Sequence, residues 1–157
     1  MNDLIKELRE ETGVSVMQCK KALDEAKGDK AQALLIIKAK GAEAAAKKGD
    51  RTLAATQIAA YIHSSGTVGV MIELACETDF VAKNPEFKAM AYDIAMHAAA
   101  TNPLTVKRET PEASAETILL EQPFIKNPDV TIAGRLSEGT QKFGEKIEIT
   151  RFTRYSA

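Results

Sequence analysis

The sequence has little net charge and few cysteines, and both shortages exclude classes of protein. Its 21 basic and 22 acidic residues give a formal net charge of −1 over 157 residues. No overall positive field is therefore available to hold nucleic acid by counterion release, and direct DNA or RNA binding is not expected. The two cysteines, Cys19 and Cys76, both lie in apolar patterns. We interpret them as small buried side chains in a reducing compartment rather than as a disulfide scaffold.

Long apolar runs and targeting segments are also lacking. No apolar run approaches the roughly 20 residues that a membrane-spanning helix needs. The segment that begins Met1-Asn2-Asp3-Leu4 has neither the basic start of a signal peptide nor the Arg-rich composition of a transit peptide. We therefore expect no membrane partner and a cytoplasmic location. The hydrophobic content of 45%, with 27% charged residues, is typical of a folded globular chain.

Signatures of catalysis are missing as well. The sequence contains no phosphate-binding glycine loop, no G-x-G-x-x-G fingerprint and no cluster of metal ligands, so neither a cofactor nor a metal is expected. The best enzyme hypothesis is a thiol hydrolase with Cys76 as nucleophile, His63 as base and Asp79 as the orienting carboxylate. Against it, Cys76 lies on an apolar strand face, which disfavours a thiolate. His63 lies beside a turn and His97 stands alone in a helical pattern, so we expect no enzyme.

Residues 1–41 predict three short helices. The second begins at Ser15, which forms a capping box with Gln18, and apolar residues then recur at helical spacing. Gly41 is expected to end the third helix. Three such helices make a small bundle, and the Ala-rich residues 42–51 predict a linker helix to the rest of the chain.

Residues 52–157 predict an α+β domain in which an antiparallel sheet packs against helices. Along the first strand of a hairpin, Ile58, Ala60 and Ile62 alternate with their neighbours; residues 68–76 alternate with one buried face. The expected elements are a hairpin over residues 52–77, a helix over 86–100, an irregular segment over 105–128, a helix over 131–142, and a final strand over 147–155 that pairs with the hairpin.

Phe80 lies between the end of the second hairpin strand and the start of the next helix. Asn84 and Pro85 are typical of a helix start, as N-cap and first helical residue. Side chains in such a connection project from a rigid base. The alternative is that the Phe80 ring folds back and fills the core, as large apolar side chains commonly do.

The string Thr-Asp-Phe-Val-Ala-Lys-Asn at residues 78–84 resembles the signature loop of the bacterial elongation factor Ts family. Further likeness to this family occurs at both ends of the chain. Residues 6–10, 12–13, 19–23 and 28–29 resemble its N-terminal domain, and residues 120–124 and 151–155 resemble its C-terminal module.

This resemblance implies a fold, a partner and a role for each residue of the loop. Residues 1–41 would form a ubiquitin-associated-like bundle and residues 52–157 a core domain of the dimerisation type. The protein would be a guanine nucleotide exchange factor for elongation factor Tu, and the bundle would grip the same GTPase domain from another side. Phe80 would enter a pocket on that GTPase domain and disturb its Mg²⁺ site. Asp79 would hold the loop and contact the partner, while Thr78 and Val81 would shape the loop.

The sequence departs from longer members of the family, which have two related core halves and an inserted coiled coil. Here there is room for a single core unit, which leaves a sheet face or edge without its companion. We expect that exposure at the strands over residues 68–76 and 147–155. A homodimer would cover it; alternatively, residues 116–145 fold over it in a monomer.

A second functional hypothesis is a peptide or protein interaction module built on the three-helix bundle, without exchange activity. It leaves the Thr-Asp-Phe-Val loop unexplained. The partner retained from cytosol separates the two: one abundant GTPase, or diverse peptide-bearing proteins.

Overall fold

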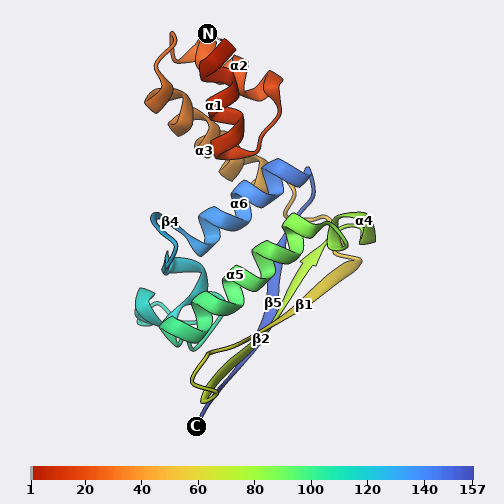
Figure 1. Ribbon diagram of the computed structural model, residues 1–157, viewed down its shortest axis with the longest axis vertical. Coiled ribbons are helices and arrows are strands. Elements are labelled where there is room, and N and C mark those ends of the chain that lie inside the picture. The colour runs from red at the N-terminus through yellow and green to blue at the C-terminus, as the bar shows by residue number, and fades with distance from the viewer. Residues whose placement is uncertain (1) are drawn as a thin grey trace.

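The computed structural model describes residues 2–157 and has the expected α+β fold. A helical bundle lies at one end of the molecule and a sheet covered by helices at the other, so the two termini are far apart (Figure 1). The elements are, in chain order, α1 (Asn2–Thr12), α2 (Val16–Glu25), α3 (Lys30–Lys47), β1 (Ala55–Ile62), β2 (Val68–Cys76), α4 (Asp79–Ala82), α5 (Pro85–Thr101), the 3-10 helices η1 (Ala115–Thr117) and η2 (Leu119–Glu121), β3 (Pro123–Phe124), β4 (Asn127–Thr131), α6 (Ile132–Phe143) and β5 (Glu148–Ser156).

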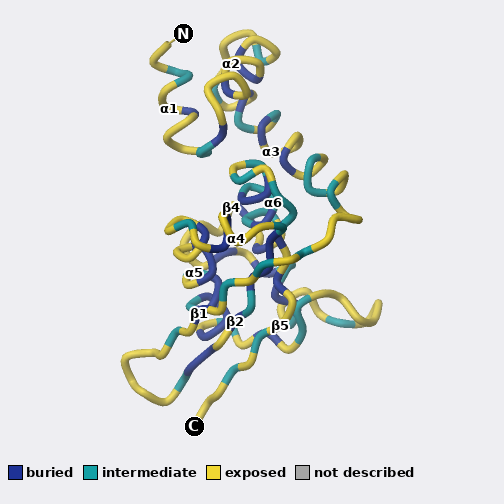
Figure 2. The backbone as a smooth tube through the Cα atoms, turned by 90° about the vertical axis from the view of Figure 1, so that its right-hand side faces the viewer, coloured by how far each residue is buried: buried dark blue, intermediate teal, exposed yellow. Residues whose placement is uncertain are grey.

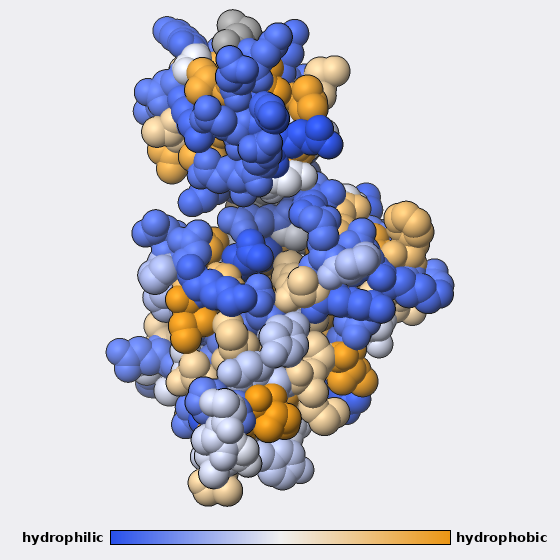
Figure 3. All heavy atoms as spheres, in the orientation of Figure 1, coloured by the Kyte–Doolittle hydropathy of each residue, from blue (hydrophilic) through white to orange (hydrophobic). Residues whose placement is uncertain are grey.

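The bundle of α1, α2 and α3 forms as its local signals predict. The Ser15 side chain accepts a hydrogen bond from the Gln18 N–H, and the Gln18 side chain accepts from the Ser15 N–H at 3.0 Å, which completes the capping box. The bundle has its own small apolar core, which contains Leu8, Val14, Cys19, Ala22, Leu23, Ala33 and Ile37. Figure 3 shows mostly hydrophilic side chains over the surface of this bundle, with hydrophobic ones scattered among them.

The prediction that Gly41 ends the third helix is wrong, because α3 continues to Lys47 and absorbs most of the expected linker helix. Gly41 is buried where α3 crosses α6, and a Cβ at this position would lie 2.8 Å from Oε1 of Gln141. The glycine therefore allows the two helices to approach closely and does not end a helix. Alanines after Gly41 favour continuation of the helix.

The sheet of the α+β part has the order β1-β2-β5, with both pairs antiparallel. Helix α5 runs across one face of it, and the buried residues gather between sheet and helices (Figures 1 and 2). The predicted alternation along β2 is confirmed, since Val70, Ile72 and Leu74 are buried. The expected hairpin and the final strand, which pairs with β2, are also confirmed. This core and the bundle core share no residue among those described.

The face of the sheet that points away from α5 carries exposed apolar side chains. Along β1, Ala59 and Tyr61 face the core, whereas Ile58 and Ile62 point outward with Met71 of β2. Tyr155 of β5 is exposed as well. Residues 116–145 do not cover this face; their apolar side chains join the core on the α5 side. The expectation that residues 68–76 form an edge is wrong, because β2 is the central strand and β1 and β5 are the edges.

The two long helices of this part also begin where the sequence predicts. The Asn84 side chain caps α5 and the Thr131 side chain caps α6, and Gly144 ends α6 with a left-handed φ of 73°. The irregular segment between them contains η1, η2 and the short β3–β4 pair. Within residues 2–157, no helix has the length and apolar character needed to cross a membrane.

Candidate functional site

The segment after β2 is a single helical turn rather than an open loop. Thr78 is the N-cap of α4 (Asp79–Ala82), and its Oγ accepts a hydrogen bond from the Val81 N–H at 3.4 Å. A hydroxyl at this position satisfies one of the free N–H groups at the start of a helix. The sequence signal for this cap is the threonine that precedes the turn.

The turn has a buried side and an exposed side. Val81 and Ala82 each retain 5% exposure and belong to the main core, so they anchor the turn to the sheet and α5. Phe80, by contrast, is 82% exposed. The hypothesis that this ring fills the core is therefore wrong. An exposed aromatic side chain on an anchored turn is suited to contact with a partner, because the apolar surface of its ring can still be buried on binding.

Asp79 is also exposed, and its carboxylate accepts a hydrogen bond from Lys83 Nζ at 2.6 Å, four residues along the chain. This hydrogen bond lowers the pKa of Asp79, so the group is a carboxylate at neutral pH. Both side chains are 75% exposed, and an ion pair of this kind contributes little to stability. Asp79 is thus available to a partner, but the contacts that hold the turn come from elsewhere.

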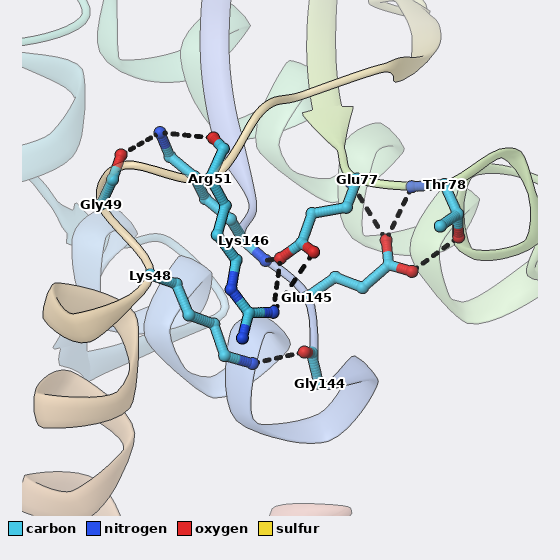
Figure 4. A network of polar contacts seen from close by, with 8 residues as sticks. All are labelled: Lys48, Gly49, Arg51, Glu77, Thr78, Gly144, Glu145 and Lys146. Atoms are coloured by element: carbon cyan, nitrogen blue, oxygen red, sulfur yellow. Dashed lines mark hydrogen bonds and ion pairs between the residues drawn. The ribbon is translucent and has the colours of Figure 1, made fainter.

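The contacts that hold the base of the turn come from Glu145, in the connection between α6 and β5 (Figure 4). Its Oε2 accepts hydrogen bonds from the N–H groups of Glu77 and Thr78, each at 3.0 Å. Its Oε1 accepts from the Thr78 hydroxyl at 2.6 Å. Sequence analysis missed this residue, because no local pattern relates it to a position 67 residues earlier.

A second carboxylate, that of Glu77, makes the reverse connection, from the end of β2 to the segment between α6 and β5. Glu77 accepts a hydrogen bond from the Lys146 N–H at 2.6 Å, and Arg51 Nη1 lies 3.2 Å from both of its oxygens. The Lys146 hydrogen bond, followed by Arg51, lowers the pKa of Glu77. Lys146 Nζ in turn donates to the backbone oxygen of Gly49 at 2.6 Å. The start of the turn is thereby joined to the segment that leaves α3.

The structure separates the residues of the thiol hydrolase hypothesis. Cys76 is fully buried, burial raises the pKa of its thiol, and its Sγ donates to the Thr78 carbonyl at 3.2 Å. Cys76 pairs with Ala55 at one end of the hairpin, whereas His63 follows the other end of β1. At about 3.3 Å per residue that places the thiol and the imidazole roughly 25 Å apart. The pair cannot act together.

His97 has a packing role within a buried polar network. The His97 Nδ1 accepts from the Ile125 N–H at 3.2 Å, so Nε2 carries the proton and donates to Gln122 Oε1 at 2.9 Å. Burial lowers the pKa of His97 and favours this neutral form. The described residues include no group of three or more His, Cys, Asp or Glu side chains suited to a metal ion.

Comparison with known proteins decides the family. A family model described as "Elongation factor TS" matches residues 29–117. Elongation factor Ts of Carboxydothermus hydrogenoformans is 43% identical over 189 aligned positions, which cover 98% of this chain and 87% of that protein. The chain belongs to the elongation factor Ts family. It is therefore a translation elongation factor that acts in protein biosynthesis.

Two further relatives confirm how much of the chain this family covers. Elongation factor Ts of Heliobacterium modesticaldum is 41% identical over 97% of this chain and 87% of the relative. That of Herpetosiphon aurantiacus is 38% identical over 98% of this chain and 95% of the relative. The alignments span more positions than the 157 residues of the chain, so the chain is shorter than these relatives within the aligned region.

Proposed function

We propose that this protein is a guanine nucleotide exchange factor that binds elongation factor Tu in the cytoplasm and promotes the release of GDP. The observation that carries the proposal is the presentation of Phe80, an exposed ring on a turn whose next two residues are buried in the core. Membership of the elongation factor Ts family supports elongation factor Tu as the partner.

The proposed mechanism needs no reacting group on this protein. A GTPase of this kind holds GDP through the amides of its phosphate loop and a bridging Mg²⁺. An exchange factor weakens that grip by binding the nucleotide-free conformation better than the GDP-bound one, and the difference in binding free energy sets the effect. In this proposal Phe80 enters a pocket on the GTPase domain, and the displacement is transmitted to the Mg²⁺ site of the partner.

The neighbours of Phe80 have separate parts in this mechanism. Asp79 offers a carboxylate to the partner beside the ring, since its only ion-pair partner among the described residues is the exposed Lys83. Thr78 caps the turn and Val81 fixes it to the core. These roles leave Phe80 and Asp79 as the groups that contact the GTPase directly.

The bundle offers a second contact surface for the same GTPase. Val16, Met17 and Leu35 of α2 and α3 are exposed apolar side chains outside the bundle core. The bundle contacts the α+β part where α3 packs against α6, so both surfaces belong to one folded molecule.

We also propose that two copies associate through the outer face of the sheet. Ile62, Met71 and Tyr155 are 68%, 55% and 75% exposed on that face, and exposed apolar patches commonly mark interaction sites. A symmetric contact would bury this face on both copies and leave one Phe80 turn on each.

The affinity of the protein for two states of elongation factor Tu tests the proposed function. Titration into nucleotide-free factor Tu and into the GDP complex, each followed by calorimetry, measures the difference that exchange requires. We expect clearly tighter binding to the nucleotide-free form. Equal affinities would refute exchange activity even if a complex forms, because a ligand that binds both states equally shifts nothing. Capture of diverse peptide-bearing proteins instead would favour the interaction module.

A further inference from the structure

The carboxylate of Glu145 uses both of its oxygens on the backbone and side chain at the base of the Phe80 turn. Oε2 accepts two backbone N–H groups at 3.0 Å, and Oε1 accepts the Thr78 hydroxyl at 2.6 Å. Hydrogen bonds to an ionised acceptor are among the stronger ones in proteins. Figure 4 shows the three bonds converging on one side chain from the α6–β5 connection.

These bonds fix the two features that decide where Phe80 points. Glu77 and Thr78 directly follow the last residue of β2, so their N–H groups are the first ones beyond the hydrogen-bonded pairs of the sheet. Glu145 holds them and so sets the direction in which the chain leaves the strand. The bond from the Thr78 hydroxyl also orients its oxygen, which accepts the Val81 N–H as the cap of α4.

The connection that carries Glu145 is itself held from several sides. Lys48 Nζ donates to the Gly144 carbonyl, and Lys146 bonds both to Glu77 and to the carbonyl of Gly49. Glu145 therefore acts from a fixed base rather than from a free loop. Arg51 completes the link by pairing with Glu77.

We infer that Glu145 is a positioning residue for nucleotide exchange, an inference that rests on the proposed function. Its hydrogen bonds go to Glu77 and Thr78 rather than to Phe80 or Asp79, the residues proposed to contact the GTPase. Its effect is to hold the turn in the binding conformation before the partner arrives, so that less ordering is needed on association. The resemblance assigned the role of holding the loop to Asp79; we assign that role to Glu145.

Three variants separate this role from a general effect on folding. Glu145→Ala removes all three bonds. Glu145→Gln is the conservative variant, because its amide oxygen can accept the two N–H groups while its NH₂ donates to the Thr78 hydroxyl. Glu148→Ala is the matched control, since that exposed carboxylate lies nearby and pairs with Lys146 rather than with the turn.

The first measurement is the rate of GDP release from elongation factor Tu at rising concentrations of each variant, also in a Phe80→Ala background. Loss of charge-assisted hydrogen bonds of this kind predicts a release rate at least roughly tenfold slower for Glu145→Ala. Glu145→Gln should regain most of the activity, and Glu148→Ala should match the unmodified protein. Because Glu145 acts through Phe80, adding Glu145→Ala to Phe80→Ala should slow release by less than about twofold.

The second measurement is amide hydrogen exchange of the free protein, which does not depend on the partner. The amides of Glu77 and Thr78 should exchange at least roughly tenfold faster in Glu145→Ala, while the amides of α5 stay unchanged. Unchanged exchange at these two amides, or full activity of Glu145→Ala, would overturn the inference. So would a slowing in the Phe80→Ala background as large as that in the unmodified protein. If the unmodified protein itself fails to accelerate GDP release, the proposed function is refuted, and the positioning role is refuted with it. Amide exchange then still reports whether Glu145 holds the N–H groups of Glu77 and Thr78.

Discussion

Replacement of Phe80 by alanine should separate exchange activity from folding. Full burial of a Phe side chain is favourable by roughly 1.5–3 kcal/mol, and 82% of this residue is exposed in the free protein. Nearly all of that gain is therefore left for the complex. Truncation to the Cβ should cost about 2 kcal/mol of interaction with the GTPase, which corresponds to a roughly thirtyfold slower GDP release.

The same change should leave the fold intact, because surface substitutions usually change stability by less than about 0.5 kcal/mol. Release of fluorescent GDP from elongation factor Tu and urea unfolding measure the two effects on one preparation. Two controls bracket the variant. Leu104→Ala removes an apolar side chain of similar exposure (71%) elsewhere and should keep full activity. Val81→Ala removes a buried anchor and should cost about 2 kcal/mol of stability. A Phe80→Ala protein that unfolds readily, or that keeps full exchange activity, would refute the reasoning.

Three further predictions concern the thiol, the buried imidazole and the sheet face. Cys76→Ala should lower the free energy of unfolding by roughly 1–3 kcal/mol but keep exchange activity per folded molecule; complete loss of activity in a stable variant would revive a role for the thiol. Burial holds the pKa of His97 in the folded state below its ordinary value, so the unfolded state binds the proton more readily. The stability that depends on neutral His97 is therefore fully present above the ordinary pKa of about 6.5 and is lost as the pH falls through the folded pKa. The free energy of unfolding in urea should show this decline when it is measured from about pH 7.5 to about pH 5, a range of about 2.5 units that begins above the ordinary pKa. In His97→Gln most of the decline should be absent; an equal decline in both proteins would contradict the assignment. Light scattering should give twice the chain mass of 17.0 kDa at micromolar concentration and a single chain for Met71→Lys, whereas a mass of one chain for the unmodified protein at every concentration would exclude the dimer.

Local sequence signals predicted the elements of this fold well. The capping box at Ser15, the Asn84-Pro85 helix start and the Gly144 helix end each depend on contacts within a few residues, and each is present. The period of two along β2 predicts one buried face, and the structure shows that face buried between the sheet and α5.

The errors all lie where tertiary contacts decide the outcome. Gly41 carries the usual sign of a helix end, yet the approach of α6 gives it a place inside α3. Likewise, the central position of β2 depends on pairing with a strand more than 70 residues later in the chain. No property of the single sequence fixes either contact.

The candidate site was predicted in part, for the same reason. Residues 78–81 stand together in the sequence, and the strand before them and the helix start after them placed Phe80 correctly. Glu145, Arg51 and Lys146 reach the turn from distant segments, so their contribution appeared only in the structure.

The rate of GDP release from elongation factor Tu tests the central claim most directly. Factor Tu loaded with fluorescent GDP is mixed with excess unlabelled GDP and increasing concentrations of this protein, and the loss of fluorescence is followed in a stopped-flow instrument. The proposed function predicts a release rate that rises with the concentration of the protein and then saturates, since exchange passes through a ternary complex. A release rate that stays at its spontaneous value at every concentration, while the protein remains folded, would contradict the proposed function.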